Sequence, residues 1–187
     1  MRLTPLTVCL LAVAPVAGAA EPFFLRDGDR VVFYGDSITD TEWYPTLVQT
    51  FVLTRHPAWR NQFSNRGQSG DNAGSLKRFE RDAVVSKPDV VIFAMGYNDG
   101  GYARFTGASL EKFLSNVEAS VRRVREAGPA VRIMLVSPTP SELAVSSDSR
   151  WVSREWYPYH LLMYSQGEAL LAARLGVGFT DMTERYG

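Results

Sequence analysis

The chain has 187 residues, of which 45% are hydrophobic and 21% are charged, and its 20 basic and 20 acidic side chains leave no formal net charge. This length is sufficient for one domain with a hydrophobic core, and the composition is typical of a globular protein. The lack of net positive charge and of any basic run argues against a nucleic-acid surface, so we expect no nucleic acid as a partner.

Residues 1–20 predict a secretory signal peptide. They have a positively charged start, a largely apolar middle and an exit of small residues at 17–20. A retained membrane anchor is the alternative, but Pro5 and Pro15 interrupt a stretch that is already short for a span. The only cysteine, Cys9, lies in this segment, so the mature chain would form no disulfide. We expect a secreted or periplasmic protein without a membrane span in its mature form.

Strands and helices alternate from residue 30 onward. Short apolar or β-branched runs predict strands at 30–34, 60–65, 89–95, 131–136 and 177–182. Helical spacing of apolar residues predicts helices at about 42–55, 73–86, 108–127 and 157–175 between them. This alternation is typical of a parallel sheet covered on both faces, and right-handed crossovers favour a doubly wound order. We therefore expect one α/β domain over residues 21–187, a three-layer α/β/α flavodoxin-like sandwich with a five-stranded parallel sheet.

Polar, glycine-containing loops follow the first three predicted strands. They are Gly35-Asp36-Ser37, Asn65-Arg66-Gly67-Gln68-Ser69-Gly70 and Gly96-Tyr97-Asn98-Asp99. Because the carboxyl ends of parallel strands lie at one edge of a sheet, we expect these loops to converge. The Ser37 hydroxyl is a potential nucleophile. The backbone N–H groups of Ser37 and Gly67 and the side-chain amide of Asn98 are donors suited to a developing oxyanion.

The three loops in this order resemble the conserved blocks of the SGNH hydrolases, also called the GDSL esterase/lipase family. The matching segments are Gly35-Asp36-Ser37-Ile38-Thr39, Asn65-x-Gly67-x-Ser69-Gly70 and Gly96-x-Asn98-Asp99. The resemblance covers about residues 24–182. It implies ester hydrolysis, commonly of carbohydrate acetyl esters or lipid esters, with Ser37 as nucleophile and with Gly67 and Asn98 completing the oxyanion hole. The serine does not lie in a G-x-S-x-G elbow, so an α/β-hydrolase is not indicated.

The family's fourth block, Asp-x-x-His, follows the last strand and carries the triad acid and base. The nearest segment here is Asp181-Met182-Thr183-Glu184, which has glutamate in the place of the histidine. We therefore expect the domain to be C-terminally truncated, with the block downstream of Gly187. The chain by itself is then expected to be nearly inactive, because removing the base of a serine triad lowers the rate on the order of 10⁶-fold.

Structural roles are the alternative for several of these residues. Ser37 could be a turn or N-cap residue, as many serines after strands are. Asp36 and Asp99 are expected to support their loops by local hydrogen bonds rather than to act on substrate. His56 falls at a predicted helix C-terminus, where a cation is mildly favourable, and His160 falls early in the last predicted helix. We expect neither to be catalytic, although a triad that uses His160 is an alternative.

Other functions are also compatible with this sequence. The missing base favours a non-catalytic domain that binds a glycan or an acyl group. A nucleotide or flavin site at the Gly35 turn is a weaker alternative, as in other doubly wound folds. Trp43, Tyr44, Tyr97 and Tyr102 could stack on a sugar ring or cover the sheet. No cluster has metal-ligand spacing, so we expect no metal and no cofactor, and the expected partner is a small-molecule or carbohydrate ester.

Overall fold

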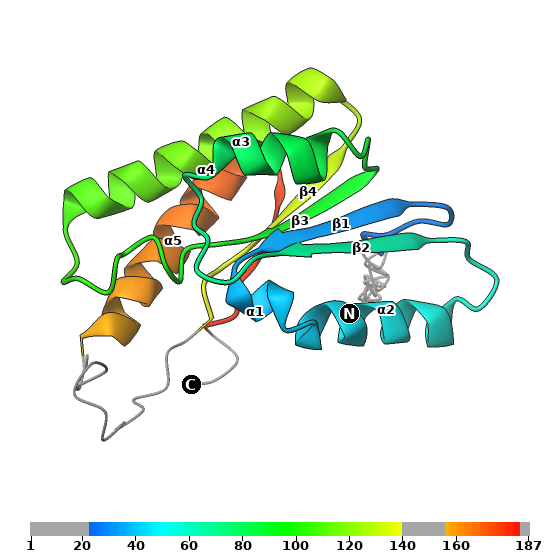
Figure 1. The fold of residues 1–187 in the computed structure, drawn as a ribbon, viewed down its shortest axis with the longest axis horizontal. Helices are drawn as coiled ribbons and strands as arrows, with labels where there is room; N and C mark the ends of the chain where they lie inside the picture. The colour runs from blue at the N-terminus through cyan, green and yellow to red at the C-terminus, as the bar shows by residue number, and fades with distance from the viewer. Residues whose placement is uncertain (1–22, 140–155, 184–187) are drawn as a thin grey trace, which may run out of the picture.

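The computed structural model describes residues 23–139 and 156–183 of the chain. Five strands form one sheet in which all neighbouring pairs are parallel, in the order β2-β1-β3-β4-β5 (Figure 1). They are β1 Arg30–Gly35, β2 Gln62–Gly67, β3 Val90–Ala94, β4 Arg132–Val136 and β5 Gly178–Thr180. This is the doubly wound order of a flavodoxin-like sandwich, so the predicted fold class is confirmed. The predicted signal peptide and the predicted truncation after Gly187 lie outside the described residues.

Helices connect the strands, with two differences from the prediction near the serine loop. They are α1 Ser37–Asp40, α2 Trp43–Arg55, α3 Leu76–Phe79 with the π-helical turn η1 Glu80–Val84, α4 Gly107–Ala127 and α5 Tyr157–Leu175. The short helix α1 is not among the predicted elements, and it begins where the Asp36 carboxylate accepts the Ile38 N–H at 2.9 Å. Helix α3 begins at Leu76 rather than at Ala73, and a separate turn closed by the bond from the Ser75 N–H to the Asn72 carbonyl at 3.1 Å precedes it.

The two faces of the sheet bury separate hydrophobic cores. Side chains alternate between the faces along each strand, so Tyr34 and Phe93 lie in one core and Phe33 and Ile92 in the other. Helices α3, α4 and α5 cover the first core, and α2 covers the second (Figure 1). Strands β1 and β3 are buried on both sides, which explains their nearly continuous apolar sequences. These central strands position the edge from which the candidate loops emerge.

Candidate active site

Ser37 lies directly after the central strand β1. It is half-buried in the first turn of α1, and its neighbour Asp36 is the buried N-cap of that helix. The connection is tight, because a Cβ on Gly35 would overlap the Thr39 side chain and lie 2.6 Å from the Ala94 carbonyl oxygen. Glycine is therefore needed here for α1 to begin at the carboxyl edge of the sheet with Ser37 in its first turn.

Gly67 ends β2 and lies against α1. A Cβ at this position would overlap the backbone of Thr39 and Asp40, at 2.6 Å from the Asp40 Cα. Asn65 ties the same two elements together, since its Nδ2 donates to the Thr39 carbonyl at 2.8 Å and its Oδ1 accepts the Gly67 N–H at 2.8 Å. The Gly67 N–H, a predicted oxyanion donor, is thus bonded to Asn65 in this structure. To stabilise an oxyanion, it would have to share its hydrogen with Asn65 Oδ1 or give up that bond. Sequence reasoning placed Asn65 in the motif but did not foresee this bond.

Asn98 is half-buried in the loop after β3, and both ends of its amide are held. Its Nδ2 donates to the Asp71 carbonyl at 2.9 Å, and its Oδ1 accepts the Tyr102 hydroxyl at 2.8 Å. An amide nitrogen carries two N–H groups, and the bond to Asp71 uses one of them. The other is of the right type for the predicted oxyanion hole.

Strand register brings the three loops to one edge of the sheet. Gly35 of β1 is paired with Gly67 on one side and with Ala94 of β3 on the other. Neighbouring strands lie about 4.8 Å apart, so loops that begin at these residues leave the sheet next to one another. The segments that carry Ser37, Gly67 and Asn98 therefore start at the same level of adjacent strands.

Buried carboxylates support this edge. Asp99 binds the Ala73 N–H, and burial raises its pKa to about 7, with smaller contributions from the charges of Asp36 and Asp71. Burial likewise raises the pKa of Asp36 to about 6, and its hydrogen bond from the Ile38 N–H opposes the shift. The Asp36 contact is the local kind that the sequence predicted, whereas the Asp99 contact joins the loop after β3 to a segment 26 residues earlier.

Asp99→Asn is expected to stabilise the protein at pH 8 more than at pH 5. The Asp99 pKa is about 7 in the fold and 3.8 for an ordinary aspartate, so the folded state binds the proton more tightly. Stability contributed by this group is complete below about pH 4 and is lost as the pH rises through 7. Asparagine cannot ionise and so removes this loss.

Thermal unfolding of both proteins at pH 5 and pH 8 measures the effect. The difference in melting temperature between Asp99→Asn and the wild type should be more positive at pH 8 than at pH 5. Glu111→Gln, at an exposed position of α4, is the matched control and should show the same small difference at both. An Asp99→Asn difference that does not change with pH would contradict the proposed cause.

The two histidines contact groups other than Ser37. His56 is the C-cap of α2, and its ring stacks on Trp59 with centroids 3.9 Å apart. His160 is fully buried in α5, where its Nδ1 is 2.9 Å from the Ala103 carbonyl oxygen and its ring abuts Gly100. Burial lowers the pKa of His160. His56 thus lies at a helix C-terminus as predicted, and His160 lies early in the last helix as predicted.

Asp181, the nearest match to the acid of the fourth block, follows β5. Its Oδ1 accepts the Ser165 hydroxyl at 3.0 Å and the Thr183 N–H at 2.7 Å. Burial acts to raise the pKa of Asp181, but hydrogen bonds from Thr183, Ser165 and Ser137 outweigh it, and the pKa is lowered. In the described part of the chain, this carboxylate shapes the turn after the last strand.

The four candidate sugar-stacking aromatics lie in three environments. Tyr44 packs edge-on against Phe33 and is within 2.9 Å of the Thr39 hydroxyl, so it covers the sheet. Trp43 is 79% exposed at the start of α2. Tyr97 and Tyr102 lie in one aromatic cluster in the loop after β3, with ring centroids 6.1 Å apart.

An apolar cavity of about 300 Å³ adjoins the serine loop on the α2 side of the sheet. It is lined by Phe33, Asp36, Ile38, Tyr44, Leu47, Val48, Ile92, Ala94, Met95, Tyr97, Met134, Val136, Ser137, Pro138, Thr139, Thr180 and Met182. Ser37 and Asn98 are not in this lining, but their chain neighbours Asp36, Ile38 and Tyr97 are. The sequence did not predict the cavity, because it is formed by side chains from four strands, two helices and the segments that follow the strands.

Within residues 23–139 and 156–183, no three histidine, cysteine, aspartate or glutamate side chains are grouped as metal ligands would be. The same residues include no helix of the length and apolarity that a bilayer span requires.

Comparisons with known proteins agree with this architecture. The family model described as GDSL-like lipase/acylhydrolase matches residues 33–186. An acetylxylan esterase of Geobacillus stearothermophilus is 30% identical over 134 residues, which cover 61% of this chain and 61% of the relative.

Solved structures show the same fold. A gut microbial diltiazem-metabolizing enzyme is 25% identical with a TM-score of 0.70, and the match covers 86% of this chain and 38% of that one. A catalytic mutant of the Geobacillus stearothermophilus acetylxylan esterase is 22% identical with a TM-score of 0.70, covering 87% of this chain and 80% of that one. The chain therefore spans less than two thirds of the length of two of these relatives.

Proposed function

Since the chain belongs to the GDSL-like lipase/acylhydrolase family, we propose that it is the serine-bearing part of a carboxylic ester hydrolase that removes acetyl groups from carbohydrates. The observation that carries the proposal is the strand pairing, which aligns Gly67 and Ala94 with Gly35. The three candidate loops leave the sheet from these aligned positions. The acetylxylan esterase relative supports an acetylated carbohydrate as the substrate class. The predicted signal peptide supports a secreted or periplasmic location.

The proposed chemistry follows from the residue types at this edge. Ser37 Oγ attacks the ester carbonyl carbon, its proton passes to a base, and negative charge develops on the carbonyl oxygen. The N–H groups of Ser37, Gly67 and Asn98 stabilise that charge. Collapse of the intermediate expels the alcohol, which takes the proton, and leaves acetyl-Ser37. Water then attacks the acyl group in the same way and releases acetate and free Ser37.

A histidine of an Asp-x-x-His block beyond Gly187 is the proposed base. The chain has two histidines, and their positions in α5 and at the end of α2 give neither one this role. A serine hydroxyl is a weak nucleophile without an adjacent base, so the proposal requires the block.

A non-catalytic domain that binds acetylated glycans is the second candidate. It is favoured by the placement of both histidines and by the bond between the Gly67 N–H and Asn65 Oδ1, which satisfies a donor that catalysis would need. Such a domain would hold the ester at the same edge without cleaving it.

Acetate release from acetylated xylooligosaccharides separates the two candidates. The longest product of the reading frame, meaning the full protein translated from the frame that encodes this chain, is expected to release acetate. Its rate on p-nitrophenyl esters should fall as the acyl chain lengthens from acetyl to octanoyl. The 187-residue chain alone should be slower on the order of 10⁶-fold. Binding without acetate release by both proteins would favour the binding domain. Serine-dependent release by the 187-residue chain alone would contradict a downstream base.

A further inference from the structure

We propose that Arg78 is the positioning residue of the candidate oxyanion hole, which it aligns by binding the backbone at the ends of β1 and β2 and by binding Asp71, whose carbonyl holds the Asn98 amide. This inference rests on the proposed function for its catalytic consequence. Its structural part stands on the contacts of one side chain. Arg78 lies in α3, far from Ser37 and Gly67 in sequence, and its side chain is only 10% exposed.

Two guanidinium nitrogens of Arg78 bind carbonyls at the ends of the neighbouring strands β1 and β2. Nη1 donates to the Arg66 carbonyl at 3.0 Å, and Nη2 donates to the Gly35 carbonyl at 3.3 Å. The Arg66 carbonyl belongs to the same peptide group as the Gly67 N–H. Because the peptide group is planar, holding this carbonyl also sets the direction of the Gly67 N–H.

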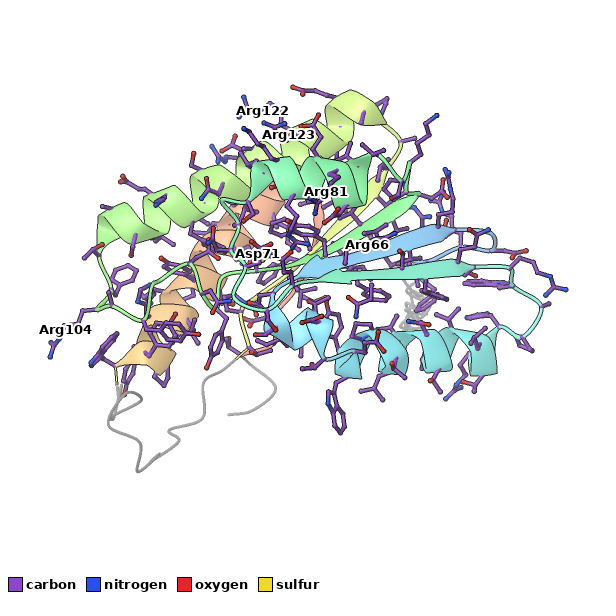
Figure 2. The ribbon with its side chains drawn as sticks, viewed as in Figure 1. Arg66, Asp71, Arg81, Arg104, Arg122 and Arg123 are labelled. Atoms are coloured by element: carbon purple, nitrogen blue, oxygen red, sulfur yellow. The ribbon has the colours of Figure 1, made fainter. Side chains whose placement is uncertain are left out.

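The third donor of Arg78 acts on the Asn98 loop through Asp71. Nε donates to Asp71 Oδ2 at 2.6 Å, and the two side chains form a buried ion pair. The main-chain carbonyl of Asp71 accepts Asn98 Nδ2 at 2.9 Å. Figure 2 shows Asp71 beneath α3 at the carboxyl ends of the strands. There it links Arg78 of α3 to Asn98 in the loop after β3. Arg78 thus acts on both predicted oxyanion donors other than Ser37. It holds the peptide group of the Gly67 N–H, and it acts on the Asn98 amide through Asp71.

The geometry requires arginine rather than any cation. The Arg78 Cζ lies 4.1 Å from the centroid of the Tyr34 ring, and the Tyr34 hydroxyl donates to Asp71 Oδ2 at 3.3 Å. Stacking on this ring orients the plane of the guanidinium, and its fixed fork of donors matches four acceptors at once: two carbonyls, the Asp71 carboxylate and, at a longer 3.4 Å, Asp82 Oδ2. Lysine keeps the charge but offers a single flexible ammonium, so we expect it to retain Asp71 and to release at least one carbonyl.

Arg78→Lys tests the proposal, with Arg81→Lys as the matched control. Arg81 lies in η1, its side chain is 70% exposed, and it binds the Asp82 carboxylate at 2.6 Å (Figure 2). The first readout is the ¹H–¹⁵N spectrum of the 187-residue chain. Arg78→Lys is expected to shift the Gly67 backbone amide and the Asn98 side-chain amide, whereas Arg81→Lys should leave both in place. Unchanged Gly67 and Asn98 signals in a folded Arg78→Lys protein would overturn the proposal, as would equal shifts in the control.

The second readout is the hydrolysis of an acetyl ester by the longest product of the reading frame. A donor misplaced by about 1 Å costs on the order of 10²-fold, so Arg78→Lys should lower kcat by about that factor with little change in KM. A change confined to KM, or an equal loss of kcat in Arg81→Lys, would overturn the positioning role. If the wild-type protein hydrolyses no ester, the proposed function fails, and the spectra still decide whether Arg78 aligns the donors.

Asp71→Asn keeps the proposal testable if Arg78→Lys does not fold. This variant weakens only the arm that leads to Asn98, so the Asn98 side-chain amide should shift while the Gly67 amide stays within its wild-type position. Equal shifts of both signals, or of neither, would contradict the proposal that Arg78 acts on Gly67 and on Asn98 through separate contacts.

Discussion

Ser37→Ala is expected to abolish ester hydrolysis by the longest product of the reading frame, with a loss on the order of 10⁶-fold in kcat, as found for removal of a serine nucleophile. The substitution deletes the oxygen that forms the acyl-enzyme and leaves the oxyanion donors in place. Release of p-nitrophenol from its acetate ester measures the loss. The fold should be unaffected, because Asp36 rather than Ser37 caps α1.

Ser69→Ala is the matched control for this prediction. Ser69 lies in the neighbouring loop, is exposed, and donates to Asp40 Oδ2 at 2.9 Å. Its removal deletes a hydroxyl from the same edge and should leave kcat nearly unchanged. Equal activity in the Ser37→Ala and wild-type proteins would rule out Ser37 as the nucleophile.

Gly67→Ala is expected to lower kcat on the order of 10²- to 10³-fold, the cost of losing one oxyanion donor. The added methyl group would overlap the backbone of Thr39 and Asp40, so either α1 or the end of β2 must move. Either movement separates Gly67 from Ser37. Overpacking of this kind also destabilises a fold by about 1–3 kcal/mol.

Ester hydrolysis and thermal unfolding of Gly67→Ala measure both effects. Gly107→Ala is the control, because a Cβ at Gly107, the first residue of α4, meets no atom within 4 Å. It should leave kcat and the melting temperature close to wild type. A fully active and equally stable Gly67→Ala protein would show that contact between β2 and α1 does not hold the site.

The sequence predicted the sheet and its functional edge because both depend on local patterns. Runs such as 89–95 are apolar enough to be strands buried on both faces, and glycine-rich loops after them mark the edge. These signals gave the order of strands and helices and the segments that carry Ser37, Gly67 and Asn98.

Contacts between distant segments could not be predicted in this way. Asp99 accepts the Ala73 N–H from a loop 26 residues away, and the Gly67 N–H is occupied because Asn65 bridges β2 and α1. Arg78 lies on what a helical pattern marks as the polar face of α3, where a solvated cation is the ordinary expectation. Only the fold reveals that Tyr34 and Asp71 enclose it.

The aligned ends of β1, β2 and β3 mean that an inserted residue would have a different effect in a strand than in a loop. One extra residue within β2 would advance its end by about 3.3 Å and turn every later side chain of that strand to the opposite face. Gly67 would then no longer stand opposite Gly35. Extra residues near Gly101, where a Cβ would meet open space, would lengthen an exposed loop and leave that alignment intact. Natural length variation in relatives of this domain should therefore accumulate in such loops and spare strands β2, β1 and β3.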